Sequence, residues 1–198
     1  MHPQTPKALT TGLQLAERDE DNDYLRLRNR DCLKTGECRK LTSGEIALSM
    51  TVFGTNIPYK SVRVYRRNFL PLQPENVLMS PDGNIYGDED GTVYSDDYSS
   101  TDFRQQAHFI HEMAHVWQVR TKGINLKLRA PFESQYAYTI EPGKRFLDYK
   151  VEQQAAIAGD YFRLLHGQPL RHGQSLNVKS PIDVYRKLLP FVLNEVWK

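Results

Sequence analysis

The sequence predicts an α+β fold in which a small, mostly antiparallel sheet packs against two helices that share a metal site. A stretch of helical period surrounds a motif at 111–115, and a second one runs over 148–167. Short apolar runs between 62 and 94 are separated by turn residues, as is typical of strands. With 198 residues, of which 39% are hydrophobic, the chain is long enough to form one domain around a sizeable core.

Residues 1–40 are charged and contain few large apolar residues, so we predict a flexible polar tail ahead of a folded domain over 41–198. One short helix is expected near 25–30. Cys32 and Cys38 stand in this segment at a spacing that fits neither a zinc knuckle nor a redox C-x-x-C motif. We expect free thiols, and a small local disulfide formed after export is the alternative.

The first part of the domain is predicted to contain one helix and a few short strands. Residues 42–45 read Thr-Ser-Gly-Glu, a capping box that opens a helix. Alternating apolar residues predict a strand over 62–69, and a Ser-Pro-Asp-Gly-Asn turn predicts a hairpin between 77–79 and 85–86. A further short strand is expected at 92–94.

The motif His111-Glu112-Met113-Ala114-His115 has the form H-E-x-x-H. On a helix its two histidines lie four positions apart on one face, where a single metal ion can bind both. Glu112 stands beside them, where it could take a proton from a metal-bound water. Ser and Thr at 99–101 are the capping candidates, and Asp102 suits the positive end of the helix dipole. An apolar stripe of helical period supports the helix: Phe103, Ala107, Ile110, Ala114 and Trp117.

A catalytic zinc needs a third protein ligand and an open fourth position for water. The metzincin pattern, with a further glycine and a third histidine immediately downstream, is excluded because Gln118 and Thr121 occupy those two positions. The remaining common option is a glutamate on a later helix. We predict that helix over 148–167, with Asp148 as its N-cap and Gly167 as its stop.

Glu152 is the preferred third ligand on this helix. A glutamate on an otherwise small and apolar helix face is costly to bury unless it is paired or bound to a metal. Glu133 and Glu141, in the intervening loop, are the alternatives. The face of Glu152 carries small residues that allow another helix to approach closely: Ala155, Ala156 and Gly159.

A closing amphipathic helix is expected to begin with Ser180 as its cap and Pro181 at its first position, and to end near Trp197. The order of elements is then helix, small sheet, metal helix, loop, ligand helix and closing helix, which is the order of a minimal zincin-like metallopeptidase. A substrate peptide is expected to lie along an edge strand above the metal helix.

Several strings resemble a family of bacterial zinc metallopeptidase domains associated with Vgr-type spike proteins of type VI secretion. They are HFIHEMAHVWQ and YKVEQQAAIAGDYF, with LTSGEIALSMTVFG and VLMSPDGNIYG upstream. The resemblance covers roughly 41–167. It implies a catalytic domain with a gluzincin-like zinc site, in which Glu112 is the catalytic base and the ligands are His111, His115 and Glu152.

The chain departs from the thermolysin version of this site. Ala156 stands four residues after the third ligand, where that version has an aspartate, so the carboxylate that usually orients the first histidine is unassigned. Asp160 is the substitute. His108 is expected to be a core histidine or a neighbour of the ligands. The donor that stabilises the oxyanion is left open among five residues: Tyr136, Tyr138, Tyr149, His166 and His172.

The predicted function is therefore a zinc-dependent metallopeptidase that hydrolyses peptide bonds through a zinc-activated water, as an antibacterial effector linked to type VI secretion. Its partners would be a peptide or protein substrate, a Vgr-type spike protein and a cognate immunity protein. An amidase acting on cell-wall peptide is a variant. The alternative class is a non-catalytic zinc-containing adaptor or cargo domain of a spike. The retained Glu112 favours the enzyme, because a structural zinc site fills its positions with protein ligands.

Charge and hydropathy exclude other classes. The net charge is +2, and the short cluster at 65–67 forms no basic stripe, so no nucleic-acid partner is expected. No apolar run approaches membrane-spanning length, and the N-terminal segment lacks the apolar core of a secretory signal. We expect synthesis in the cytoplasm and export by a route that reads no signal peptide, with action in the periplasm of a target cell.

Overall fold

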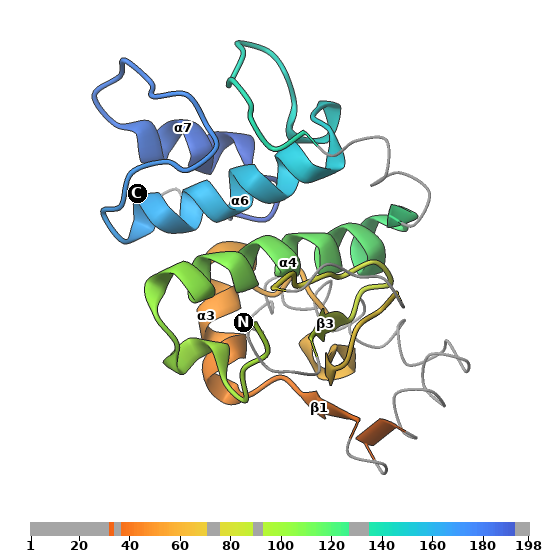
Figure 1. The fold of residues 1–198 in the computed structure, drawn as a ribbon. Coiled ribbons are helices and arrows are strands. Elements are labelled where there is room, and N and C mark those ends of the chain that lie inside the picture. Colours follow the sequence, from red (N-terminus) through yellow and green to blue (C-terminus); the bar gives the residue numbers. More distant parts are fainter. Residues whose placement is uncertain (1–31, 34–36, 71–75, 89–92, 127–134, 193–198) are drawn as a thin grey trace, which may run out of the picture.

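The fold is a stack of helices on a small sheet, seen in a computed structural model that describes residues 32–33, 37–70, 76–88, 93–126 and 135–192 (Figure 1). Helices α4 and α6 pack along each other. The other side of α4 contacts α3 and β3, while α7 covers α6. The helices are α3 (Ser43–Phe53), α4 (Phe103–Lys122), α6 (Val151–Leu165) and α7 (Pro181–Leu188), and the strands are β1 (Cys38–Lys40), β2 (Arg63–Arg66) and β3 (Ile85–Gly87).

The three strands of the described sheet follow the order β1-β2-β3. β1 pairs with β2 antiparallel, and β2 pairs with β3 parallel. The expectation of a mostly antiparallel sheet is therefore wrong. The predicted hairpin forms only one antiparallel bridge, between Met79 and Tyr86, so its first arm does not add a strand. The predicted strand at 92–94 is also wrong for its described part, because 93–94 form no strand. The backbone of Tyr94 instead packs closely on Gly87: a Cβ added to Gly87 would lie 3.1 Å from the Tyr94 Cα.

Helix α3 begins as predicted. Thr42 Oγ1 accepts a hydrogen bond from Glu45 N at 3.0 Å, and Glu45 Oε2 accepts one from Thr42 N at 2.9 Å, which confirms the capping box. The Glu45 carboxylate is fully buried and is also held by two hydrogen bonds from Arg39, at 2.8 and 2.7 Å. Because Arg39 lies on β1, this ion pair fixes the first strand to the helix.

The segment predicted as a tail contains structure at its end. Cys38–Lys40 forms β1, while 1–31 and 34–36, including the helix expected near 25–30, lie outside the described residues. Cys32 and Cys38 form a disulfide, so the expectation of free thiols is wrong and the local disulfide given as the alternative is present. Their Cα atoms are 5.3 Å apart, a distance that suits a disulfide, and both residues are buried against Tyr65 and Tyr86.

We expect reduction of this disulfide to lower the free energy of unfolding by about 2 kcal/mol, because it closes a short loop in the unfolded chain. Urea unfolding of the oxidised and reduced protein would measure the difference. A Cys32→Ser/Cys38→Ser variant serves as the control, since its unfolding should not respond to the reductant. Equal midpoints for the oxidised and reduced protein would contradict the expectation.

The closing helix starts as predicted, with Pro181 in its first turn, but it ends at Leu188 and not near Trp197. Leu189 is extended, with φ −75° and ψ 124°, because the residue before Pro190 is sterically excluded from the helical region. Trp197 itself lies outside the described residues. No helix in the described ranges is long and apolar enough to cross a membrane.

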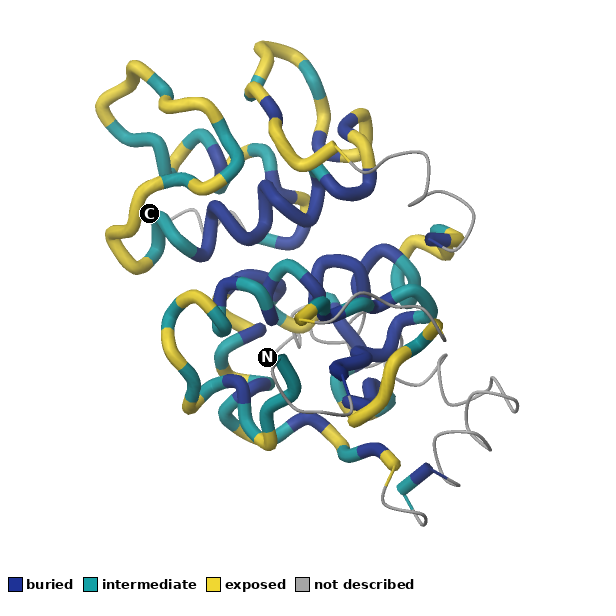
Figure 2. Tube along the Cα trace, in the orientation of Figure 1, coloured by how far each residue is buried: buried dark blue, intermediate teal, exposed yellow. Residues whose placement is uncertain are grey.

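The core is centred on α4 and α6, which are the most continuously buried elements (Figure 2). Every residue from 154 to 162 on α6 is buried, because α4 covers one side of this helix and α7 another. Functional side chains on these two helices are therefore held on a rigid support.

Candidate metal centre

Helix α4 presents the motif on a well-capped helix. Asp102 is the N-cap: its Oδ1 accepts a hydrogen bond from Gln105 N at 2.9 Å, so the cap is this aspartate and not a Ser or Thr at 99–101. The helix stops at Gly123, which has the left-handed φ of 65°. The predicted apolar stripe is buried from Ala107 onward, and Phe103 is partly buried.

Helix α6 is shorter at its start than predicted. Lys150 is the N-cap, whereas Asp148 belongs to a 3-10 helix, Phe146–Asp148, and pairs with Arg145 at 2.8 Å. Asp148 lies two residues before the true N-cap, which explains why the sequence pattern indicated it as the N-cap. The small-residue face does lie against α4: a Cβ on Gly159 would be 4.0 Å from the His111 Cβ.

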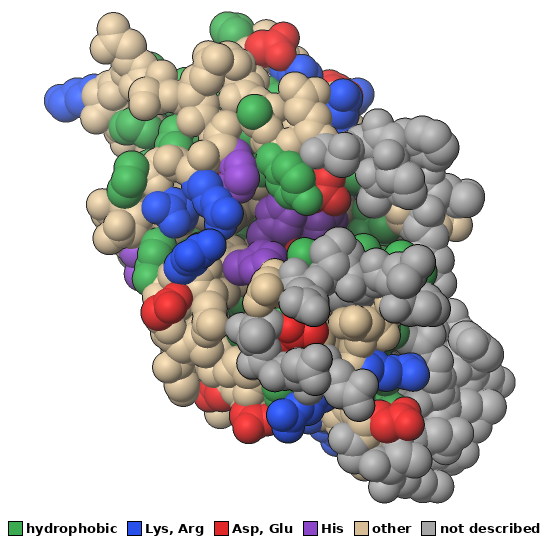
Figure 3. Space-filling model, in the orientation of Figure 1, with side chains coloured by type: hydrophobic (Ala, Val, Ile, Leu, Met, Phe, Trp, Pro, Cys, Tyr) green, Lys and Arg blue, Asp and Glu red, His purple; other side chains and the backbone are tan. Residues whose placement is uncertain are grey.

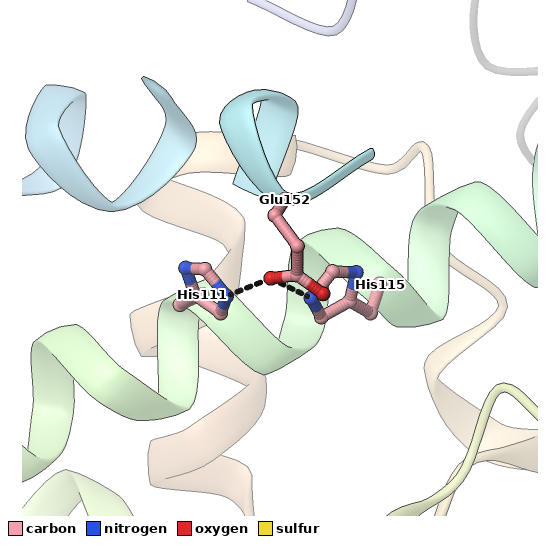
Figure 4. A group of neighbouring side chains, drawn as sticks. All are labelled: His111, His115 and Glu152. Atoms are coloured by element: carbon pink, nitrogen blue, oxygen red, sulfur yellow. Dashed lines mark hydrogen bonds and ion pairs between the residues drawn. The ribbon is translucent and has the colours of Figure 1, made fainter. Parts of the chain in front are cut away.

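Three side chains from the two helices converge on one point (Figure 4). Glu152 Oε2 is 3.3 Å from His111 Nε2 and 3.2 Å from His115 Nε2. All three potential ligand atoms lie within 4.8 Å of one another. Of the alternatives to Glu152, Glu133 lies outside the described residues, and Glu141 is exposed and pairs with Lys144 at 2.8 Å.

The electrostatics of this cluster favour a charged carboxylate between two histidines. Burial opposes ionisation of Glu152, but hydrogen bonds to His111 and His115 hold its pKa well below its usual range. Burial lowers the pKa of His111 to about 4. Burial also opposes the charge on His115, but its hydrogen bond to Glu152 raises its pKa to about 9. A cation at this point would replace the protons that the cluster otherwise holds.

Glu112 faces the same centre without being part of the cluster. Burial raises its pKa to about 7. Its Oε2 is buried and accepts no hydrogen bond from the described residues. Its Oε1 is 3.8 Å from Nε2 of His108, which agrees with the prediction that His108 neighbours the site without joining the ligands. A buried carboxylate with a free oxygen is suited to accept a proton.

Gln118, to which the sequence pattern assigned no role at the site, orients one of the histidines. Its Oε1 accepts a hydrogen bond from His115 Nδ1 at 2.8 Å, and its Nε2 donates to Val151 O at 2.9 Å and to Gln154 Oε1 at 3.0 Å. Because Nδ1 of His115 then carries the proton, Nε2 keeps its lone pair for a metal. The position three residues after His115, on the same helix face, is the signal that could have indicated this.

Asp160 forms no hydrogen bond with His111, the first histidine of the motif, so that expectation is wrong. Its carboxylate is buried on α6 and accepts hydrogen bonds from the backbone N–H groups of Arg171, His172 and Gly173 at 2.6, 3.0 and 2.8 Å. It also accepts one from Tyr138 Oη at 2.8 Å. The carboxylate therefore fixes the loop after α6.

A cleft of about 1090 Å³ lies over the cluster, and His111, Glu112, His115 and Glu152 all line it. Of the five candidates for an oxyanion donor, only Tyr136 and His172 line this cleft. The Tyr136 ring is 5.8 Å from that of His111, and 5.5 Å from that of His172. The other three hydrogen-bond elsewhere: Tyr138 to Asp160, Tyr149 to Thr139 O, and His166 to Phe162 O.

The fold and the cluster define the class: an α+β domain whose two central helices bring together two histidines and a glutamate that could hold a metal ion. No protein-family profile matches the chain. The solved effector domain of Pseudomonas aeruginosa VgrG2b is similar, with a TM-score of 0.61 and 39% identity over 65% of this chain and 75% of that structure. The chain belongs to the family of this VgrG2b effector domain.

The full-length relative is the type VI secretion system spike protein VgrG2b of P. aeruginosa strain PAO1. It is 40% identical over 132 residues, which are 63% of this chain but only 13% of the spike protein. The chain thus spans a small part of that relative.

Proposed function

We propose that this chain is a zinc-dependent metallopeptidase and an antibacterial effector of type VI secretion. The observation that carries the proposal is Glu112, a buried carboxylate beside the His111, His115 and Glu152 cluster in a cleft, whose Oε2 accepts no hydrogen bond from the part of the chain that the structure describes. Two imidazoles and a carboxylate are a donor set that zinc prefers at catalytic sites, with one position left open.

The residues fit a bound zinc. His111, His115 and Glu152 would hold it, since their ligand atoms already converge and Gln118 fixes the tautomer of His115. When bound, zinc supplies a water of lowered pKa and polarises a carbonyl. Glu112 takes a proton from the attacking water and later delivers it to the leaving amine. Tyr136 and His172, which line the same cleft, would orient the carbonyl oxygen of the substrate.

The wall of the cleft offers a way to bind a peptide backbone. Val77, Leu78, Met79 and Ser80 line the cleft, and Met79 uses both its backbone groups on Tyr86. Because backbone groups alternate in direction along an extended segment, those of Leu78 and Ser80 point to the opposite edge. A substrate peptide pairing with this edge would be held largely through its main chain.

Delivery by type VI secretion rests on the family. VgrG2b is a spike protein of that system, so a Vgr-type spike is the proposed partner of this chain, with an immunity protein in the producing cell. The Cys32–Cys38 disulfide supports action in an oxidising compartment such as the periplasm of a target cell.

The second candidate is a zinc-containing adaptor or cargo domain without turnover. The likeness to part of a spike protein is the observation that favours it. A buried Glu112 whose Oε2 accepts no hydrogen bond from the described residues costs stability without serving such a domain, which favours the enzyme.

We expect the purified protein to carry about one zinc per chain and to release new amino groups from casein. Treatment with 1,10-phenanthroline should abolish this hydrolysis and added zinc should restore it, because the ligands lose the group that they hold. The isomer 1,7-phenanthroline, which cannot chelate, is the matched control. Zinc-loaded protein that leaves casein intact, or hydrolysis that survives chelation, would contradict the proposal.

A further inference from the structure

The cleft has a strongly cationic end. Arg104, Arg163 and Arg171 line it together with the histidine and glutamate cluster. Figure 3 shows Lys and Arg side chains gathered beside the histidines on one face of the molecule. The three arginines come from the first turn of α4, the last turn of α6 and the loop that follows α6. We refer to these three residues as the arginine arm.

Surrounding structure fixes the side chain of Arg163 and the backbone of Arg171. Arg163 donates from Nε to Pro169 O at 2.6 Å, and its guanidinium lies 5.5 Å from the centre of the Phe103 ring. The backbone of Arg171 is fixed by Asp160, whose Oδ1 accepts its N–H. The held guanidinium of Arg163 loses less entropy when it binds a ligand.

The charge of the arm is not neutralised by the protein. Within the described ranges, none of the three guanidinium groups forms an ion pair with a carboxylate. Four carboxylates line the same cleft: Glu112 and Glu152 at the metal cluster, and Asp102 and Asp160 outside it. Asp160 is buried and its oxygens accept four hydrogen bonds, and Asp102 Oδ1 accepts the N-cap hydrogen bond of α4. Outside the metal cluster, the three guanidinium groups therefore share the cleft with two carboxylates that already accept hydrogen bonds. The positive charges of Arg104 and Arg171 also help to lower the pKa of His108, after burial and the charge of His111.

The position of the arm relative to the metal cluster sets a spacing. Arg104 precedes His111 on the same helix, and seven residues correspond to about 10 Å along the axis. Helices α4 and α6 run antiparallel, since Phe162 stacks on Phe103 while Glu152 meets His115. The arm therefore lies at one end of the cleft. An extended peptide advances about 3.3 Å per residue, so about three residues span the distance.

We infer that the arginine arm is a specificity site that binds a carboxylate of the substrate two to four residues from the scissile bond. The inference rests on the proposed peptidase function. A guanidinium matches a carboxylate with two parallel hydrogen bonds, which makes it selective for this group. The carboxylate comes from an Asp or Glu side chain or from the C-terminus of the peptide.

The test uses quenched fluorescent dodecapeptides derived from the casein site that the protein cuts best, with Glu, Gln or Lys placed at single positions. Glu at one position two to four residues from the cut should raise kcat/KM about tenfold or more over Gln. An Arg104→Glu/Arg171→Glu variant should lose this preference and favour Lys. Peptides ending two to four residues from the cut, with free or amidated C-termini, distinguish a terminal carboxylate from a side chain.

The control is Lys179→Glu/Lys187→Glu, which makes the same change of charge at two exposed lysines away from the cleft. It should keep the preference of the wild type. Equal cleavage of the Glu, Gln and Lys peptides, or an unchanged preference in the arginine variant, would overturn the inference.

A binding measurement separates this inference from the peptidase proposal. Fluorescence anisotropy of the labelled Glu and Gln peptides needs no turnover. Tighter binding of the Glu peptide that disappears in the arginine variant, in a protein that cuts nothing, would support the arm and refute the peptidase. Cleavage with no preference in either measurement would refute the arm alone.

Discussion

Glu112→Gln is expected to lower kcat/KM for peptide hydrolysis by about a hundredfold to ten-thousandfold while the protein still folds and binds zinc. The amide of glutamine has nearly the size of the carboxylate but accepts no proton at neutral pH. The three converging ligand atoms belong to His111, His115 and Glu152, so replacing the carboxylate of Glu112 should not release the metal. Its Oε2 accepts no hydrogen bond from the described residues, and the substitution should therefore leave stability unchanged or slightly raised.

The matched control is Glu141→Gln, which makes the same chemical change at an exposed glutamate outside the cleft and should keep full activity. Zinc content by atomic emission and thermal unfolding would be measured on the same samples. Expression in the periplasm of a sensitive bacterium gives a second readout, in which the Glu112→Gln protein should lose toxicity. A zinc-loaded Glu112→Gln protein with undiminished activity would refute the assignment and favour the adaptor alternative.

The helices could be predicted from sequence because the signals that start and stop them are local. The box formed by Thr42 and Glu45, the proline at 181 and the glycine at 123 each act within one helical turn. Among the helices, the largest difference from the prediction is the end of α7, which follows from the restriction that Pro190 places on Leu189. The sheet was harder to predict, because the parallel pairing of β2 with β3 joins residues 21 positions apart, such as Val64 and Ile85, and no local pattern encodes such contacts.

The convergence of the candidate ligands was also predictable, since the spacing of His111 and His115 fixes their geometry on one helix. Glu152 required an argument about burial: a glutamate among small residues implies a close helix partner, and α4 is that partner. The partners of these ligands were not predictable in the same way. Gln118 bonds to His115 while its amide meets α6, and the Asp160 carboxylate reaches the loop after α6, so both roles depend on tertiary packing.

Glu152→Ala is expected to reduce the zinc content from about one per chain to about none, because two histidines alone do not hold a catalytic zinc. The substitution should also remove the link between α4 and α6 that the metal provides. With zinc at about a hundred times its dissociation constant, binding contributes about 2.7 kcal/mol to the stability of the wild type, and this increment should vanish in the variant. Thermal unfolding with and without added zinc would measure it.

Glu152→Ala also removes the ion pairs to His111 and His115, so the stabilities of the wild type and the variant are compared both without and with zinc. Without zinc, the wild type and the variant should differ only by that local loss; with zinc, only the wild type should gain stability. Glu141→Ala removes the described alternative to Glu152, an exposed residue paired with Lys144, and should bind zinc as the wild type does. If Glu152→Ala kept its zinc and Glu141→Ala lost it, the third ligand would lie in the loop before α6. Glu152 would then pair with His111 and His115 without binding the metal.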